Sequence, residues 1–186
     1  MSLPSALFER PLIRLSGPVD HDMLQSFISQ SDAALKAGGP IVLELTTSGG
    51  EADLGRRIAE DIRLSRAQGK QWLFLGKTAV FSAGVTIMSG FPRECRYLSK
   101  DAQLLIHERR LRKDLRLDGA LRSVEGVIRD VLAEVQNGQL LEREGFEALV
   151  AGSDLDIDAL YEHVLRENWY LSAADALGHR LVAGIV

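Results

Sequence analysis

The chain has 186 residues, 46% of them apolar and only 6% aromatic, so it is long enough for one domain with a mainly aliphatic core. Lys and Arg number 22 and Asp and Glu 26, and the net charge of −4 argues against a nucleic-acid or anionic-membrane partner. Cys95 is the only cysteine, no apolar run is long enough to span a membrane, and the N-terminus does not resemble a signal peptide. We therefore expect a soluble, cytoplasmic protein.

The first half of the chain alternates apolar runs with amphipathic segments. Strands are predicted from β-branched and apolar runs at about 11–17, 41–45, 71–75, 95–98 and 102–107. Helices are predicted between them at about 20–35, with Asp20 or Asp22 as N-cap, at about 53–66 and at about 82–88. This alternation at short intervals favours an α/β fold with right-handed crossovers.

The second half has a different character. A charged run follows His107, and a long amphipathic helix is predicted over about 118–136, with apolar residues at helical spacing from Leu121 to Val135. The pair Asn137-Gly138 is predicted to end or bend this helix. The remaining predicted elements are helices near 139–150 and 156–167 and a closing strand in 179–186. Because we find no repeat or linker, we expect a single domain over residues 1–186.

The stretch TTSGG, residues 46–50, follows the second predicted strand. Its two glycines let the backbone turn sharply and approach a ligand closely. If a helix starts just after them, its free N–H groups favour a negative charge in the same space, as an oxyanion hole requires. A strand-to-helix turn that simply needs glycine explains the same pattern.

Ser82 and His107 each admit a structural and a catalytic interpretation. Ser82 heads the helix predicted in AVFSAGVTIMSG (79–90) and is either an N-cap or a nucleophile, with room for a substrate beside Ala83 and Gly84. His107 ends the predicted strand AQLLIH and either reaches a cleft or has a structural role. No metal or cofactor is predicted, because neither a metal-ligand spacing nor a nucleotide-binding glycine motif is present.

In this order the motifs resemble those of the proteolytic subunits of Clp proteases. TTSGG-EADLGRRIAEDI is similar to the family's Gly-Gly turn and helix, AVFSAGVTIMSG to its nucleophile segment, and AQLLIH to its histidine strand. ERPLIRLSGPVDHDM and NWYLSAADALGHRLVAGIV resemble its first strand and helix and its C-terminal segment. The resemblance implies a Clp-protease/crotonase-like α/β fold of repeated strand–turn–helix units, with an altered helical handle at about 109–155.

The resemblance also implies roles for four residues and an activity. Ser82 matches the nucleophile and His107 the general base, while Gly50 and Ala83 match the positions whose backbone N–H groups form the oxyanion hole. The implied activity is that of a serine endopeptidase, which cleaves peptides or unfolded polypeptides through an acyl-enzyme. A ring-like homo-oligomer is implied as well.

The family's third catalytic residue, an aspartate, has no direct match. Asn168 stands at that position, and its carbonyl group can orient an imidazole but cannot supply a negative charge. The alternatives are that Asp154, Asp156 or Asp158 takes the role, or that no third residue works.

Other departures concern the partners. The segment after His107 lacks the family's glycine-containing, substrate-pairing strand, although Leu111, Leu115 and Leu117 alternate as a strand edge would. Trp169 stands where the family usually has an arginine, next to the catalytic acid, that takes part in contacts between two oligomeric rings. The chain begins close to its first strand, so we expect a short N-terminal segment, which weighs against docking to an AAA+ unfoldase.

Two alternatives to an active peptidase remain open. One is a weakly active or inactive paralogue that serves as a structural or regulatory ring subunit. The other is a crotonase-like acyl-CoA enzyme, which would share the fold and a similar oxyanion hole.

Overall fold

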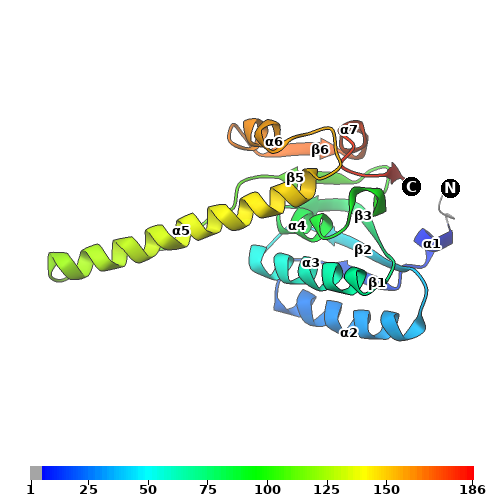
Figure 1. Cartoon of the computed structure of the whole chain (residues 1–186), viewed down its shortest axis with the longest axis horizontal. Coiled ribbons are helices and arrows are strands. Elements are labelled where there is room, and N and C mark those ends of the chain that lie inside the picture. The colour runs from blue at the N-terminus through cyan, green and yellow to red at the C-terminus, as the bar shows by residue number, and fades with distance from the viewer. Residues whose placement is uncertain (1–5) are drawn as a thin grey trace.

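A computed structural model describes residues 6–186, and a seven-stranded sheet runs through it (Figure 1). Five strands are parallel and lie in the order β1 (Ile13–Ser16), β2 (Ile41–Thr47), β3 (Trp72–Phe81), β4 (Arg96–Leu98) and β7 (Gly184–Ile185). The other two are β5 (Gln103–Ile106), which pairs in parallel with the end of β3, and β6 (Trp169–Ser172), which is antiparallel to β5. The predicted α/β arrangement is therefore present, and β6 and the length of β3 go beyond what the sequence predicted.

Helices cover one face of this sheet (Figure 1). α2 (His21–Ala37) and α3 (Ala52–Ala67) lie side by side, and the short α4 (Ala83–Ser89) follows β3. α2 begins at Asp20, one of the two predicted N-caps, whose carboxylate accepts the Met23 N–H, and it ends at Gly38 with φ of 75°. The opposite face carries a smaller apolar cluster under α1 (Ala6–Glu9), formed by Phe8, Val42, Leu73 and Leu75.

β3 changes its neighbour halfway along its length. Residues Phe74–Gly76 pair with β4, whereas Ala79–Phe81 pair with β5. Between these two halves the register against β2 shifts, and Thr78 adopts a φ of 57°. Such a bulge bends a strand, and here it leads the end of β3, and with it Ser82, to the end of β5.

The predicted break at Asn137-Gly138 is wrong. α5 (Leu121–Val150) is one helix of 30 residues that passes through this pair. A glycine inside a helix costs only about 1 kcal/mol, and the neighbouring turns continue the helical pattern on both sides. The C-terminal part of α5 packs against α4, whereas its N-terminal part extends away from the sheet (Figure 1).

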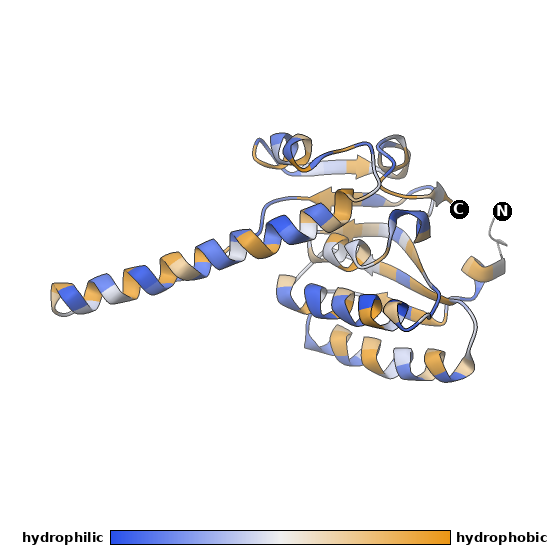
Figure 2. Ribbon diagram, in the orientation of Figure 1, coloured by the Kyte–Doolittle hydropathy of each residue, from blue (hydrophilic) through white to orange (hydrophobic). Residues whose placement is uncertain are grey.

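The apolar stripe of α5 is not buried within the chain. Hydrophobic and hydrophilic residues are interleaved along its extended part (Figure 2), and Leu121, Ile128 and Leu132 are exposed. Residues 107–120, which precede the helix, have no regular secondary structure, so the strand edge suggested by the alternating leucines does not form in this structure.

The C-terminal elements are short. They are α6 (Ile157–Val164), β6, α7 (Ala173–Gly178) and β7, and a single 3₁₀ turn, η1 (Arg93–Cys95), precedes β4. The predicted closing strand is present, with two residues in β7. Across residues 6–186, no helix combines the length and apolar character needed to cross a membrane. The expected short N-terminal segment falls largely on residues 1–5, outside the described part.

Candidate active site

Ser82 joins β3 to α4 in a strained backbone conformation. Its φ of 54° and ψ of −114° lie in a region that few residues other than glycine adopt, and such outliers concentrate at functional sites. Its N–H donates to the Leu105 carbonyl of β5 at 2.8 Å. Ser82 occupies the N-cap position of α4, yet its hydroxyl makes no capping hydrogen bond. Capping therefore does not explain the serine.

Glycines bring the TTSGG turn against Ser82. A Cβ on Gly49 would lie 2.8 Å from the Cβ of Ser82, and one on Gly84 would lie 2.5 Å from a methyl carbon of Thr47. Gly50 has φ of 152°, and a Cβ there would lie 2.3 Å from the Val19 carbonyl oxygen. Real Cβ atoms do not approach other atoms this closely. The TTSGG turn can therefore pack against the Ser82 segment only because these positions are glycines.

Two backbone donors beside Ser82 are unused. Within residues 6–186, the N–H groups of Gly50 and Ala83 have no hydrogen-bond partner. Both residues line the same cavity as Ser82. Free N–H groups close to a nucleophile are what an oxyanion hole requires.

His107 lies at the end of the strand next to Ser82. Phe81 pairs with Leu105, so Ser82 and His107 both follow the carboxyl ends of parallel neighbours, and both line a cavity of about 440 Å³. The half-buried His107 has its Nδ1 2.6 Å from the Glu108 carbonyl oxygen. A carbonyl only accepts, so Nδ1 carries the proton and, in the neutral ring, Nε2 is left free to accept one.

Asn168 lies opposite His107 in the register of β5 and β6. The ladder ends with Ile106 paired to Trp169, so His107 and Asn168 lie one residue beyond it on the two strands, and both line a second hollow of about 280 Å³. However, the Asn168 Oδ1 accepts from the Arg110 guanidinium at 3.1 Å. Within residues 6–186 no hydrogen bond joins the side chains of Ser82, His107 and Asn168.

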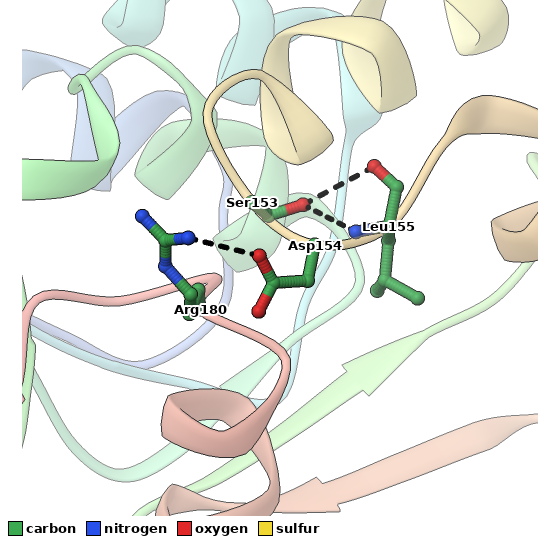
Figure 3. Close-up of polar contacts among 4 residues, drawn as sticks. All are labelled: Ser153, Asp154, Leu155 and Arg180. Atoms are coloured by element: carbon green, nitrogen blue, oxygen red, sulfur yellow. Dashed lines mark hydrogen bonds and ion pairs between the residues drawn. The ribbon is translucent and has the colours of Figure 1, made fainter.

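The three aspartates considered as alternatives lie elsewhere. Asp154 pairs with Arg180 at 3.0 Å, next to Ser153, whose hydroxyl contacts the backbone of Leu155 (Figure 3). Asp156 caps α6 by accepting the Ala159 N–H at 2.7 Å, and Asp158 follows in the first turn of that helix. None of the three lines either described cavity. Helix capping and dipole effects account for the last two.

Charged residues around the larger cavity were not predicted from the sequence. Arg56 of α3 reaches α5, where it donates to the Leu141 carbonyl at 3.2 Å and to Glu144 at 3.1 Å. Arg109 pairs with Asp53 of α3 at 2.8 Å. These contacts join α3, the segment after His107 and α5 into one wall.

The far wall of the cavity comes from α5. Its lining residues recur at helical spacing and are Leu141, Glu142, Gly145, Phe146 and Leu149. Glu142 accepts hydrogen bonds from the Arg109 N–H and the Tyr161 hydroxyl, and burial together with this carboxylate raises the pKa of Tyr161. The lining residues of α5 recur at the spacing of one helix face. The sequence would have indicated this face if the predicted helix had continued past Gly138.

Comparison with known proteins bears on the fold, although no family model matches the chain. A solved structure of ClpP1 from Listeria monocytogenes, an Asn-to-Asp mutant, superposes with a TM-score of 0.75 over 98% of this chain and 94% of that one, at 15% identity. The ATP-dependent Clp protease proteolytic subunit 2 of Treponema pallidum (strain Nichols) is 25% identical over 178 residues, or 94% of this chain and 81% of that protein.

The fold is therefore the α/β fold of the Clp-protease and crotonase type, as the sequence motifs implied. The sequence similarity extends along nearly the whole chain. In sequence and in fold the chain is thus distantly similar to the proteolytic subunits of Clp proteases.

Proposed function

We propose that the protein is a serine endopeptidase of the Clp type that cleaves peptides or unfolded polypeptides. The observation that carries the proposal is the state of Ser82. Its backbone is strained and its hydroxyl does not cap the helix, and it shares a cavity with His107 and two free N–H groups. Strain of this kind costs about 1–3 kcal/mol and is concentrated at functional sites.

The chemistry follows from these positions. His107 Nε2 takes the proton of the Ser82 hydroxyl as its oxygen attacks the scissile carbonyl, and the N–H groups of Gly50 and Ala83 stabilise the resulting oxyanion. His107 returns the proton to the leaving amine, and water then releases the acyl group by the same route. The apolar part of the α5 wall, including Phe146 and Leu149, provides a surface for a substrate side chain.

Asn168 is the proposed third member of the site. Its register opposite His107 supports this role, since directly opposed residues in an antiparallel pair have Cβ atoms about 5 Å apart. An amide carbonyl orients the imidazole but adds no negative charge beside the imidazolium. Turnover is therefore expected to be slower than with an aspartate.

A second candidate function is that of a weakly active ring subunit with a structural or regulatory role. It is favoured by one observation: Arg110 already occupies the Oδ1 of Asn168, and His107 uses the Glu108 carbonyl instead. We also propose a ring-like homo-oligomer, which the family resemblance implies. Copurification with an active paralogue, without intrinsic hydrolysis, would favour this second function.

The test of the leading proposal is hydrolysis of fluorogenic peptides and of an unfolded protein. Ser82→Ala and His107→Ala should each lower the rate by about 10⁴-fold or more, because they remove the nucleophile and its base. Ser123→Ala, at an exposed position in the first turn of α5, is the matched control and should leave the rate unchanged. Unchanged turnover in Ser82→Ala would contradict the proposal, and thioester hydrolysis that survives this change would support an acyl-CoA enzyme.

A further inference from the structure

Arg110 connects the segment after His107 to Asn168. Its guanidinium donates to the Asn168 Oδ1 at 3.1 Å, and both side chains are exposed in the 280 Å³ hollow that His107 also lines. The preceding residue, Arg109, pairs with Asp53 of α3. Successive arginines thus attach this segment to α3 and to the residue before β6.

The contact holds the Asn168 carbonyl group at Arg110, and within residues 6–186 no hydrogen bond from His107 reaches that oxygen. Nδ1 of His107 donates instead to the Glu108 carbonyl at 2.6 Å, although His107 and Asn168 directly follow and precede the paired residues Ile106 and Trp169. Two acceptors are therefore available to one N–H group, and one of them is engaged by a cationic donor. A hydrogen bond from a charged group is stronger than one from a neutral imidazole N–H.

We propose that Arg110 is a positioning residue that restrains Asn168 and thereby keeps Ser82 less reactive than the site allows. This inference rests on the proposed peptidase function. Arg110 does not touch the reacting atoms, and it acts through the choice of acceptor for His107. Because the contact is exposed, its removal is expected to change the rate only modestly, by about twofold to fivefold.

The role of Arg110 determines what is expected when an aspartate is restored at position 168. In Asn168→Asp the new carboxylate would face Arg110, which binds carboxylates better than amides. The carboxylate would then pair with the arginine instead of orienting His107. Restoring the aspartate alone should therefore have little effect, whereas restoring it without Arg110 should have a large one.

The experiment measures the rate at which a fluorophosphonate probe labels Ser82, as a function of pH, in four forms of the full chain. These are the native protein, Arg110→Met, Asn168→Asp and the double variant. Methionine keeps much of the side-chain length and removes the donor. Arg112→Met is the matched control, because Arg112 is an exposed arginine of the same segment. Ser82→Ala reports background labelling.

The expected result is a rise of about twofold to fivefold in Arg110→Met and less than about twofold in Asn168→Asp. The labelling rate of the double variant should exceed the native rate by about tenfold or more. This increase is small compared with the factor of about 10⁴ that a catalytic aspartate contributes in a serine protease. The midpoint of its pH–rate profile should also move to higher pH, since a carboxylate beside the imidazole favours the protonated form. A purely structural role for Arg110 would give Asn168→Asp and the double variant the same midpoint.

The contrary outcomes separate the two proposals. If native Ser82 is labelled and Arg110→Met leaves the rate unchanged or lowers it, the role of Arg110 is overturned and the peptidase proposal stands. The same holds if Asn168→Asp alone reaches the rate of the double variant. If no form is labelled above the Ser82→Ala background, the double variant included, both proposals are overturned.

Discussion

At Gly50 the backbone passes so close to Val19 that no side chain fits. This residue has a φ of 152°, and a Cβ added to it would lie 2.3 Å from the Val19 carbonyl oxygen. Its N–H is also one of the two free donors beside Ser82. The backbone packing at Val19 and the proposed oxyanion hole therefore both involve Gly50.

We predict that Gly50→Ala loses about 1–3 kcal/mol in the free energy of unfolding and most of its peptidase activity. Gly126→Ala is the control, because a Cβ there meets open space on α5 and alanine should raise stability by about 0.5–1 kcal/mol. Urea unfolding and hydrolysis rates of both variants check the prediction. Equal effects of the two substitutions would show that the fit at Gly50 has no special importance.

Much of the candidate site was predictable from short motifs. Ser82, Gly50 and Ala83 stand in local patterns of small residues, and His107 ends an apolar strand. These patterns alone left structural alternatives open, and the resemblance to the Clp family selected the four residues. Arg110 and Glu142 were missed because their roles depend on contacts between distant segments. The sequence of one segment does not reveal which side chain of another it meets.

Among the elements, α5 is anchored by a buried cation. Arg96 of β4 is 1% exposed, and its guanidinium donates to the carbonyl groups of Phe91, Ala148, Leu149 and Leu181. Two of these acceptors lie in the last turn of α5, where unsatisfied carbonyls favour a positive charge. Burial lowers the pKa of Arg96 to about 10, so the side chain remains charged at neutral pH.

Arg96→Met should lower the free energy of unfolding by about 2–4 kcal/mol, because it leaves buried carbonyls without donors. Arg93→Met, three residues earlier and without a side-chain hydrogen bond within residues 6–186, is the control and should change it by less than about 0.5 kcal/mol. Chemical denaturation measures both changes. A loss in Arg96→Met no greater than in the control would mean that the anchor is not needed.

Element boundaries were predicted less well than element types. α5 continues through Asn137-Gly138 because packing of its C-terminal half and helix formers on both sides outweigh one glycine. β3 runs past the predicted end at residue 75 because the bulge near Thr78 lets it continue with a new partner, β5. Both errors come from tertiary contacts overriding a local signal.

At the scale of the whole molecule, the extended part of α5 exposes apolar residues that a lone chain leaves in water. They include Leu121, of which 87% is exposed, together with Ile128, Leu132 and Leu140. Burying such side chains is worth about 1.5–3 kcal/mol each. We therefore expect this stripe to contribute to the proposed oligomer.

Replacing Ile128 and Leu132 together by glutamate should convert the assembled protein into smaller species, because two charges would be placed on the apolar stripe. Gln136→Glu adds a charge to the same helix at an exposed polar position and serves as the control. Sedimentation velocity of the three proteins at equal concentration measures the change. If the double variant sediments like the native protein, the stripe has no part in assembly.

The central claim is that Ser82 is an activated nucleophile, and the most direct test is intact-mass measurement after incubation with a fluorophosphonate. We predict one phosphonyl adduct on the native protein, mapped to Ser82 by peptide analysis, and none on Ser82→Ala. A native protein that stays unmodified, or an adduct that persists in Ser82→Ala, would contradict the account.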